Sequence, residues 1–162
     1  CERADWKRVD LPHDWSVKLP FDKNGSPSWG YKPKGKAWYR KQFALGKELK
    51  DKNITLEFDG AAKDCFVYFN GSLLKRHYSS YAPFTVDITD RAYFDGTPNV
   101  LAVYLDAEGW EGWWYEGAGL YRHVRLVAKE KVSVAQYGIF VCPRLADGVW
   151  SSPAQITLEN TG

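Results

Sequence analysis

Apolar and polar residues alternate with a period of two along most of the chain from Ala37 onward. In Ile54–Phe58 every second residue is apolar, and Asp59-Gly60 then supplies a turn. Strands with one buried face require this spacing, whereas the 3.6-residue repeat of a helix is nowhere sustained. The alternation therefore predicts an all-β fold.

A β-hairpin is predicted between Cys65–Phe69 and Ser72–Arg76. The two residues that join these strands, Asn70-Gly71, tolerate the positive φ angles of a tight turn. The two strands are therefore expected to be antiparallel neighbours in one sheet.

Three further strands are predicted downstream of the hairpin. Phe84–Ile88 alternates, Val100–Leu105 is apolar on both faces, and Tyr121–Val127 follows. A strand that is apolar on both faces is expected at the centre of a sheet, covered on both sides. Short strands separated by Gly, Pro, Asn and Asp turns are typical of a two-layer sandwich, and we predict a jelly roll.

The alternating pattern is interrupted by the charged segment Lys129-Glu130-Lys131. Two strand-like segments follow, Val132–Cys142 and Ala154–Leu158. A pair of strands cannot close a core of its own. We therefore predict a jelly-roll domain over residues 1–128 and an incomplete second domain over residues 129–162.

Composition excludes several classes of protein. The 162 residues are 44% hydrophobic, enough for a real core. With 22 Lys and Arg against 20 Asp and Glu the net charge is +2, and the basic residues are scattered, so we expect no nucleic-acid partner. The longest apolar segments are far shorter than the roughly 20 residues of a membrane helix, so no membrane span is expected.

The start of the chain predicts either a processed form or a piece cut from a longer polypeptide, and we favour the piece. The sequence begins at Cys1, contains no Met and shows no charged-then-apolar leader. Cys1, Cys65 and Cys142 form an odd, widely spaced set that suits neither zinc nor a disulfide framework. Cys65 alternates with apolar residues and is predicted to lie in the core.

The best candidate for a functional site is the segment 106–117, in which acids and aromatic residues gather. Its candidate substrate-binding residues are Asp106, Glu108, Trp110, Glu111, Trp113, Trp114 and Tyr115, with Glu116 beside them. Sugar rings stack on flat aromatic faces and their hydroxyls bond to carboxylates. The alternative is that these aromatics pack against a neighbouring domain.

Other parts of the chain offer weaker candidates. Trp29-Gly30-Tyr31 is expected to approach the 106–117 segment or to cover one end of the sandwich. In His13-Asp14 the two side chains point to opposite sides of an extended chain, so a turn or packing role is predicted rather than an acid–base pair. The sequence carries no nucleophile, metal or nucleotide motif, and we expect no metal, cofactor or catalytic residue in this chain.

The order of several motifs resembles the N-terminal sugar-binding domain of glycoside hydrolase family 2, in particular of bacterial β-galactosidases. The segments that carry the resemblance are Leu11-Pro12-His13-Asp14-Trp15-Ser16-Val17, Gly30-Tyr31-x-Pro33-x-Gly35, Trp38-Tyr39-Arg40-Lys41, Phe58-Asp59-Gly60, Tyr81-Ala82-Pro83-Phe84, Asn99-Val100-Leu101-Ala102-Val103 and Trp114-Tyr115-x-Gly117-x-Gly119-Leu120-Tyr121-Arg122. They cover essentially the whole chain.

This resemblance implies a galactose-binding-domain-like jelly roll, the start of an immunoglobulin-like domain, and a catalytic barrel outside this chain. It implies that Asp106 and the loop after it help to shape the pocket for the non-reducing sugar of a β-galactoside or related glycan. Many relatives have a polar stretch ending in Arg where this chain has Glu111-Gly112-Trp113. Galactosidase, glucuronidase and mannosidase activities of the parent enzyme therefore stay open, with galactosidase first.

The resemblance also sets expectations for the chain alone. We expect a parent enzyme that is a retaining hydrolase, located in the periplasm or secreted, and a fragment that is inactive by itself. The alternative is an autonomous carbohydrate-binding module without hydrolase activity.

Overall fold

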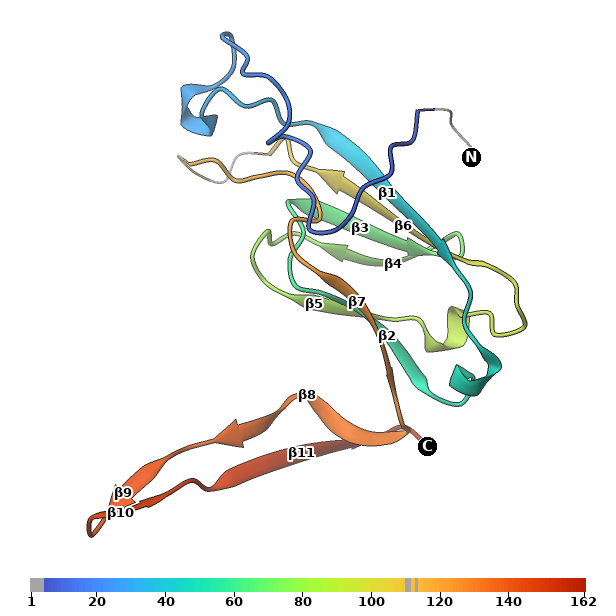
Figure 1. The fold of residues 1–162 in the computed structure, drawn as a ribbon, viewed down its shortest axis with the longest axis vertical. Coiled ribbons are helices and arrows are strands. Elements are labelled where there is room, and N and C mark those ends of the chain that lie inside the picture. The colour runs from blue at the N-terminus through green and yellow to red at the C-terminus, as the bar shows by residue number, and fades with distance from the viewer. Residues whose placement is uncertain (1–4, 110–111, 113) are drawn as a thin grey trace.

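The computed structural model describes residues 5–109, 112 and 114–162, and two parts are evident in it (Figure 1). The larger part consists of two packed antiparallel sheets. The smaller part is a long β-hairpin at the C-terminal end that extends away from the sheets (Figure 1). The prediction of an all-β sandwich is confirmed.

The larger sheet of the sandwich has the strand order β1-β6-β3-β4. Its strands are β1 (Lys36–Phe43), β6 (Asn99–Asp106), β3 (Asp64–Phe69) and β4 (Ser72–His77). Most neighbours in this sheet are not consecutive in sequence, because the chain crosses repeatedly between the two layers, as in a jelly roll.

The smaller sheet has the strand order β5-β2-β7. β2 (Asn53–Phe58) lies between β5 (Phe84–Asp87) and β7 (Val124–Lys129). Residues of β2 alternate between half-buried and buried, which confirms a strand with one buried face. Single turns of 3₁₀ helix at Pro27–Trp29, Lys47–Leu49 and Thr89–Arg91 connect the strands.

β6 lies between β1 and β3, which confirms that it is a central strand. Val103 and Leu105 point into the core and are buried, whereas Ala102 and Tyr104 are only half-buried. The prediction that this strand is covered on both sides is therefore wrong, because only its inward face is fully buried. The outward face receives only partial cover, from aromatic side chains of β1 and β3.

The interior of the sandwich is filled from both sheets. The Phe58 and Phe84 rings stack with centroids 4.6 Å apart and planes 6° from parallel. Cys65 is fully buried, as predicted, and burial raises the pKa of its thiol to about 12. The buried cluster comprises Leu45, Ile54, Leu56, Phe58, Ala61, Cys65, Val67, Phe69, Phe84, Val86, Ile88, Leu101, Val103, Leu105 and Leu120.

The predicted hairpin between β3 and β4 is confirmed. Asn70 and Gly71 have φ angles of 47° and 85°, the left-handed values that a tight turn requires. The Asn70 side chain also accepts a hydrogen bond from the Val100 N–H (2.8 Å) and donates one to Asn99 Oδ1 (2.9 Å). The turn is thereby attached to the start of β6.

One end of the sandwich is closed by segments without regular structure. The N–H groups of His13 and Trp15 donate to the carbonyls of Leu120 (2.8 Å) and Ala118 (3.1 Å). Between them lies Gly119 with φ 138°, where a Cβ would collide with the His13 carbonyl, so the position requires glycine. The strand predicted from Tyr121 begins only at Val124, beyond this closed end.

The C-terminal hairpin is formed by β8 (Val132–Val141) and β11 (Ala154–Asn160), close to the two predicted strands. Its tip carries the short strands β9 (Arg144–Ala146) and β10 (Val149–Ser151), which were not predicted. β7 ends at Lys129, where the sequence predicts the domain boundary. The immunoglobulin-like character of the second domain stays a prediction.

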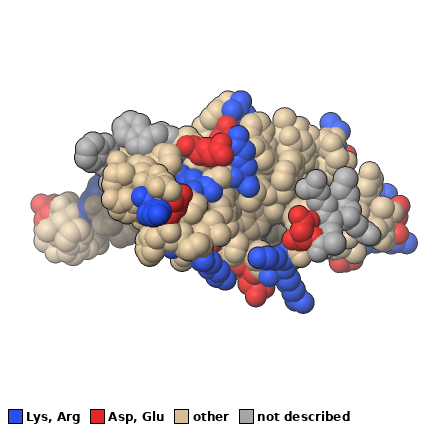
Figure 2. Space-filling view, turned by 90° about the horizontal axis from the view of Figure 1, so that it is seen from above, with Lys and Arg blue, Asp and Glu red and all other residues tan. Residues whose placement is uncertain are grey.

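Charges on the face drawn in Figure 2 are mixed, with acidic and basic side chains next to each other. Such a face does not provide a continuous basic track for a phosphate backbone. Among the described residues, no helix is long and apolar enough to cross a membrane.

Candidate functional site

The candidate loop begins where β6 ends, at Asp106. Asp106 stands directly opposite Lys36 in the β1–β6 ladder, so the two side chains share one face of the sheet. Of the seven candidate binding residues, Trp110, Glu111 and Trp113 lie outside the described residues. Asp106, Glu108, Trp114 and Tyr115 are described.

Asp106 and Glu108 are brought together by a shared lysine. Lys36 Nζ lies 3.0 Å from Asp106 Oδ2 and 3.1 Å from Glu108 Oε2. The Glu108 N–H donates to Asp106 Oδ1 at 3.0 Å. Partial burial acts to raise the pKa of Asp106, but the Glu108 N–H and the Lys36 ammonium together hold that pKa below its usual range. Asp106 therefore stays ionised at neutral pH and is suited to accept hydrogen bonds from hydroxyl groups.

The two described aromatics of the loop have different partners from the acids. Trp114 is 52% exposed, and its indole N–H donates to the Tyr81 hydroxyl at 2.9 Å. The Tyr115 hydroxyl donates to Asp14 Oδ2 at 2.8 Å, and burial, together with the Asp14 carboxylate, raises the pKa of Tyr115 to about 12. Among the described residues of the loop, the exposed indole of Trp114 and the carboxylates of Asp106 and Glu108 are thus held in place by different partners.

Asp14 has the turn role that the sequence predicts. Its Oδ1 accepts hydrogen bonds from the N–H groups of Ser16 (2.8 Å) and Val17 (3.2 Å). His13 instead has its Nδ1 at 2.8 Å from the Tyr39 hydroxyl, and burial is the main cause that lowers the pKa of this imidazole. The adjacent histidine and aspartate are therefore not an acid–base pair.

A buried ion pair that sequence reasoning missed lies beneath the loop. Lys34 Nζ pairs with Glu116 Oε2, and the two side chains are only 3% and 1% exposed. Glu116 Oε1 also accepts the Gly112 N–H at 2.8 Å, while Lys34 Nζ lies 4.4 Å from the centre of the Trp29 ring. No local pattern identifies Lys34 as the partner, because 82 residues separate the two.

This cluster confirms that the Trp29 segment approaches the candidate loop. The Ala107 N–H donates to the Gly35 carbonyl at 2.9 Å, so backbone contacts join the same two segments. A buried, paired charge is costly to break, so the pair holds the Glu116 end of the loop against the segment that carries Lys34.

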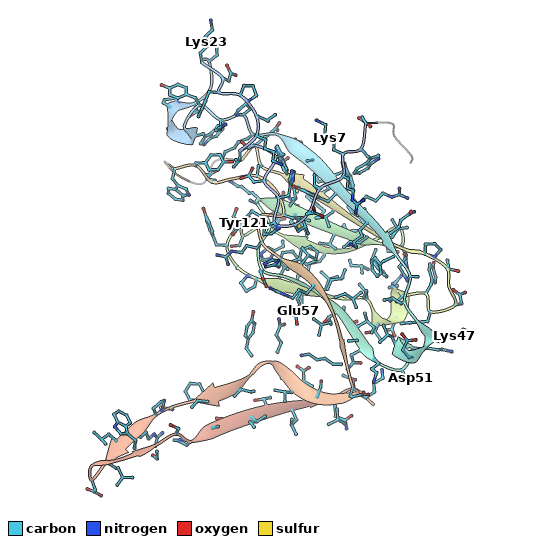
Figure 3. The ribbon with its side chains drawn as sticks, in the orientation of Figure 1. Lys7, Lys23, Lys47, Asp51, Glu57 and Tyr121 are labelled. Atoms are coloured by element: carbon cyan, nitrogen blue, oxygen red, sulfur yellow. The ribbon has the colours of Figure 1, made fainter. Side chains whose placement is uncertain are left out.

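The described residues also form two open hollows, which lie between the sandwich and the C-terminal hairpin. The first has a volume of about 470 Å³, and its lining residues are Pro12, Asp59, Pro83, Tyr121, Arg122, His123 and Tyr137. The second has about 610 Å³ and lies between the end of β2, near Glu57, and β8. Figure 3 shows Tyr121 within the sandwich and Glu57 on the side facing the hairpin. Neither hollow includes the loop after β6.

Known proteins that resemble this chain are glycoside hydrolases. No family model matches it. A β-galactosidase of Bacteroides ovatus is 37% identical over 88% of this chain, and a β-glucuronidase of Formosa agariphila is 30% identical over 96%. A solved structure of a glycosyl hydrolase family 2 member from Bacteroides cellulosilyticus superposes with a TM-score of 0.81 at 31% identity over 90% of the chain. The chain belongs to glycoside hydrolase family 2.

Family 2 relatives are much longer than this chain. The chain spans 17% of the B. ovatus protein and 18% of the F. agariphila protein. A β-glycosidase from Bacteroides vulgatus superposes with a TM-score of 0.88 over 97% of this chain, which is 21% of its own length. This family 2 chain therefore corresponds to one accessory domain of a larger glycoside hydrolase, and not to an autonomous module.

Proposed function

We propose that the chain packs on a catalytic barrel of its parent enzyme and that the loop after β6 forms one wall of the substrate pocket. In this role Asp106 accepts hydrogen bonds from hydroxyl groups of the sugar, with Glu108 and the loop aromatics beside it. The parent enzyme is a retaining glycoside hydrolase that supplies both catalytic acids from its barrel.

The geometry of Asp106 and Glu108 carries this proposal. Glycoside hydrolysis needs one carboxyl group with a raised pKa to protonate the leaving oxygen. The pKa of Asp106 is shifted the opposite way, by the Glu108 N–H and Lys36. An ionised, fixed acceptor at the edge of a sheet is suited to binding and orienting a sugar rather than to acid catalysis.

The relatives favour a β-galactoside as the first candidate substrate. The relative that is 37% identical is a β-galactosidase, although β-glucuronidases are also among the relatives. At the loop, the carboxylates of Asp106 and Glu108 share the ammonium of Lys36, and the charge of Lys63 also lowers the pKa of Asp106. Carboxylates held by lysines in this way are suited to accept hydrogen bonds from the hydroxyl groups of a neutral sugar.

The first test is an assay of the 162-residue chain with nitrophenyl β-galactoside, β-glucuronide and β-mannoside. We expect no hydrolysis above background, because one wall of a pocket without an acid pair does not lower the barrier. Turnover that persists through purification would overturn the accessory role.

The second test uses a longer polypeptide that includes the barrel. We expect Asp106→Asn to lower kcat/KM for the β-galactoside by about 10–100-fold, the effect of losing a charge-assisted hydrogen bond. Asp95→Asn is the matched control, since Asp95 precedes β6 and lies at the opposite end of the sheet. Equal kcat/KM values for the two variants would contradict the role of Asp106.

A further inference from the structure

The outward face of the larger sheet carries an unusual set of side chains, which we call the aromatic face. Its members alternate with the core residues along β1, β6, β3 and β4. They are Lys36, Trp38, Arg40, Gln42, Val100, Ala102, Tyr104, Asp106, Asp64, Phe66, Tyr68, Leu73 and Arg76.

One row of this face crosses all four strands in register. Trp38 stands opposite Tyr104, Tyr104 opposite Phe66, and Phe66 opposite Arg76. The ring centroids are 5.0 Å apart for Trp38–Tyr104 and 5.7 Å for Phe66–Tyr104, and the Arg76 guanidinium lies 4.6 Å above the Phe66 ring. Since strands are about 4.8 Å apart, the row is about 14 Å long.

The two ends of the row are its most exposed positions, and the Arg76 side chain on β4 is 45% exposed. Trp38 is 49% exposed, although its ring contacts both Tyr104 and Tyr68. Arg76 is held in place by both oxygens of Asp64, at 3.0 Å and 2.6 Å. The face is therefore a fixed aromatic surface with a large indole at its edge.

A second row, of charged residues, lies beside the aromatic row, at the end of β6 where the candidate loop begins. Lys36, Asp106 and Asp64 stand opposite one another on β1, β6 and β3. The aromatic face is thus continuous with the loop for which we propose a place at the substrate pocket.

The C-terminal hairpin offers a contrast on one of its two exposed faces, which is mainly aliphatic, whereas the opposite face carries Phe140. Val134 stands opposite Leu158, and Ile139 opposite Ile156. Aliphatic faces are typical of domain interiors, whereas Trp, Tyr, Phe and Arg are enriched at interfaces between folded surfaces. The aromatic face has the composition of an interface between folded surfaces.

We propose that the aromatic face is the surface through which this domain docks on another folded domain of the same polypeptide, with Trp38 as its principal anchor. The proposed occupant is a further domain of the parent polypeptide rather than a separate protein, because the relatives are about five times longer than the 162-residue chain. The inference rests on the proposed function, in which the adjoining loop reaches a pocket on that second domain.

Hydroxyl-radical footprinting with mass spectrometry tests this docking directly. Trp38 and Trp6 are 49% and 43% exposed, so in the 162-residue chain both indoles should be oxidised at similar rates. In a longer polypeptide that includes the barrel, oxidation of Trp38 should fall by about tenfold or more, as for a desolvated interface anchor, while Trp6 serves as the internal reference. Equal oxidation of Trp38 in the two proteins would overturn the proposal.

Three other outcomes would assign the face to a different occupant and would also overturn the proposal. Protection of Trp38 in the 162-residue chain that grows with protein concentration would indicate a second copy. Protection that requires added cellotetraose or galactotetraose would indicate a glycan. Protection in the longer polypeptide that extends equally to Trp6 would indicate general shielding rather than docking through this face.

A substitution provides the second measurement. Trp38→Asp should lower the melting temperature of the 162-residue chain by about 10 °C or less, because the ring is half-exposed and loses only its contacts with Tyr104 and Tyr68. In the longer polypeptide it should restore oxidation of Tyr104, which the docked domain covers. If Asp106→Asn impairs the parent enzyme while Tyr104 stays protected in Trp38→Asp, the pocket role stands and the docking inference fails.

Discussion

The sandwich and the C-terminal hairpin have the same alternating sequence pattern, yet they bury their apolar side chains very differently. In the sandwich, Ile54 and Phe69 are 0% exposed. In the hairpin, Ile139, Ile156 and Leu158 are 61%, 57% and 64% exposed. The comparison teaches that alternation specifies which face of a strand is apolar, whereas a second layer decides whether that face is covered.

A matched pair of phenylalanine substitutions should show this difference most strongly. Phe58 is 1% exposed and stacks on Phe84, so Phe58→Ala should lower the free energy of unfolding by about 4 kcal/mol. Phe140 is 63% exposed, so Phe140→Ala should lower it by less than about 0.5 kcal/mol. Urea denaturation followed by circular dichroism measures both. Similar losses would mean that the hairpin is covered in solution, for example by a second copy.

A buried and an exposed ion pair allow the same comparison between the interior of the sandwich and its junction with the hairpin. Lys34 pairs with Glu116 in the interior of the sandwich end, whereas Lys52 pairs with Glu130, whose side chain is 71% exposed at the junction with the hairpin. Lys34→Met leaves a carboxylate buried without its partner and should cost about 3 kcal/mol. Lys52→Met should cost less than about 1 kcal/mol, because water and salt screen the exposed pair.

Urea midpoints of the two lysine variants provide the measurement. The double variant Lys34→Met with Glu116→Gln serves as the control, since it removes both charges and should recover part of the loss. A double variant that is as unstable as Lys34→Met alone would show that the loss arises from packing rather than from the unpaired charge.

Much of the sandwich was predictable because its signals are local. The alternation in β2 and the Asn70-Gly71 turn depend on neighbouring residues, and both predictions are confirmed. The outward face of β6 was mispredicted, because apolar residues there contact aromatic neighbours without a covering layer. Sequence alone does not distinguish these two environments of an apolar residue.

The candidate site was predictable only in part. The acids and aromatics of the loop were identified by their clustering, and Asp106 and Glu108 do lie together. Their shared partner Lys36 is set by strand register, and the Lys34–Glu116 pair joins segments far apart in sequence. Such long-range partners depend on the fold and leave no periodic trace in the chain.

Acidification should distinguish the two parts by a smaller effect, because histidine occurs in the sandwich and not in residues 130–162. Burial is the largest cause that lowers the pKa of both His13 and His77 from the ordinary value of 6.5. The unfolded chain therefore takes up protons below about pH 6.5 that the folded sandwich does not bind. Stability from this source is fully present above that pH and is lost as the pH falls.

We expect the urea midpoint of the sandwich to decrease modestly between pH 7.5 and pH 5.5, a window in which ordinary carboxylates do not titrate. His13→Gln combined with His77→Gln should flatten this dependence. A pH dependence that survives in the double variant would show that other groups control it. An increase in stability on acidification would contradict the burial of neutral imidazoles in the sandwich.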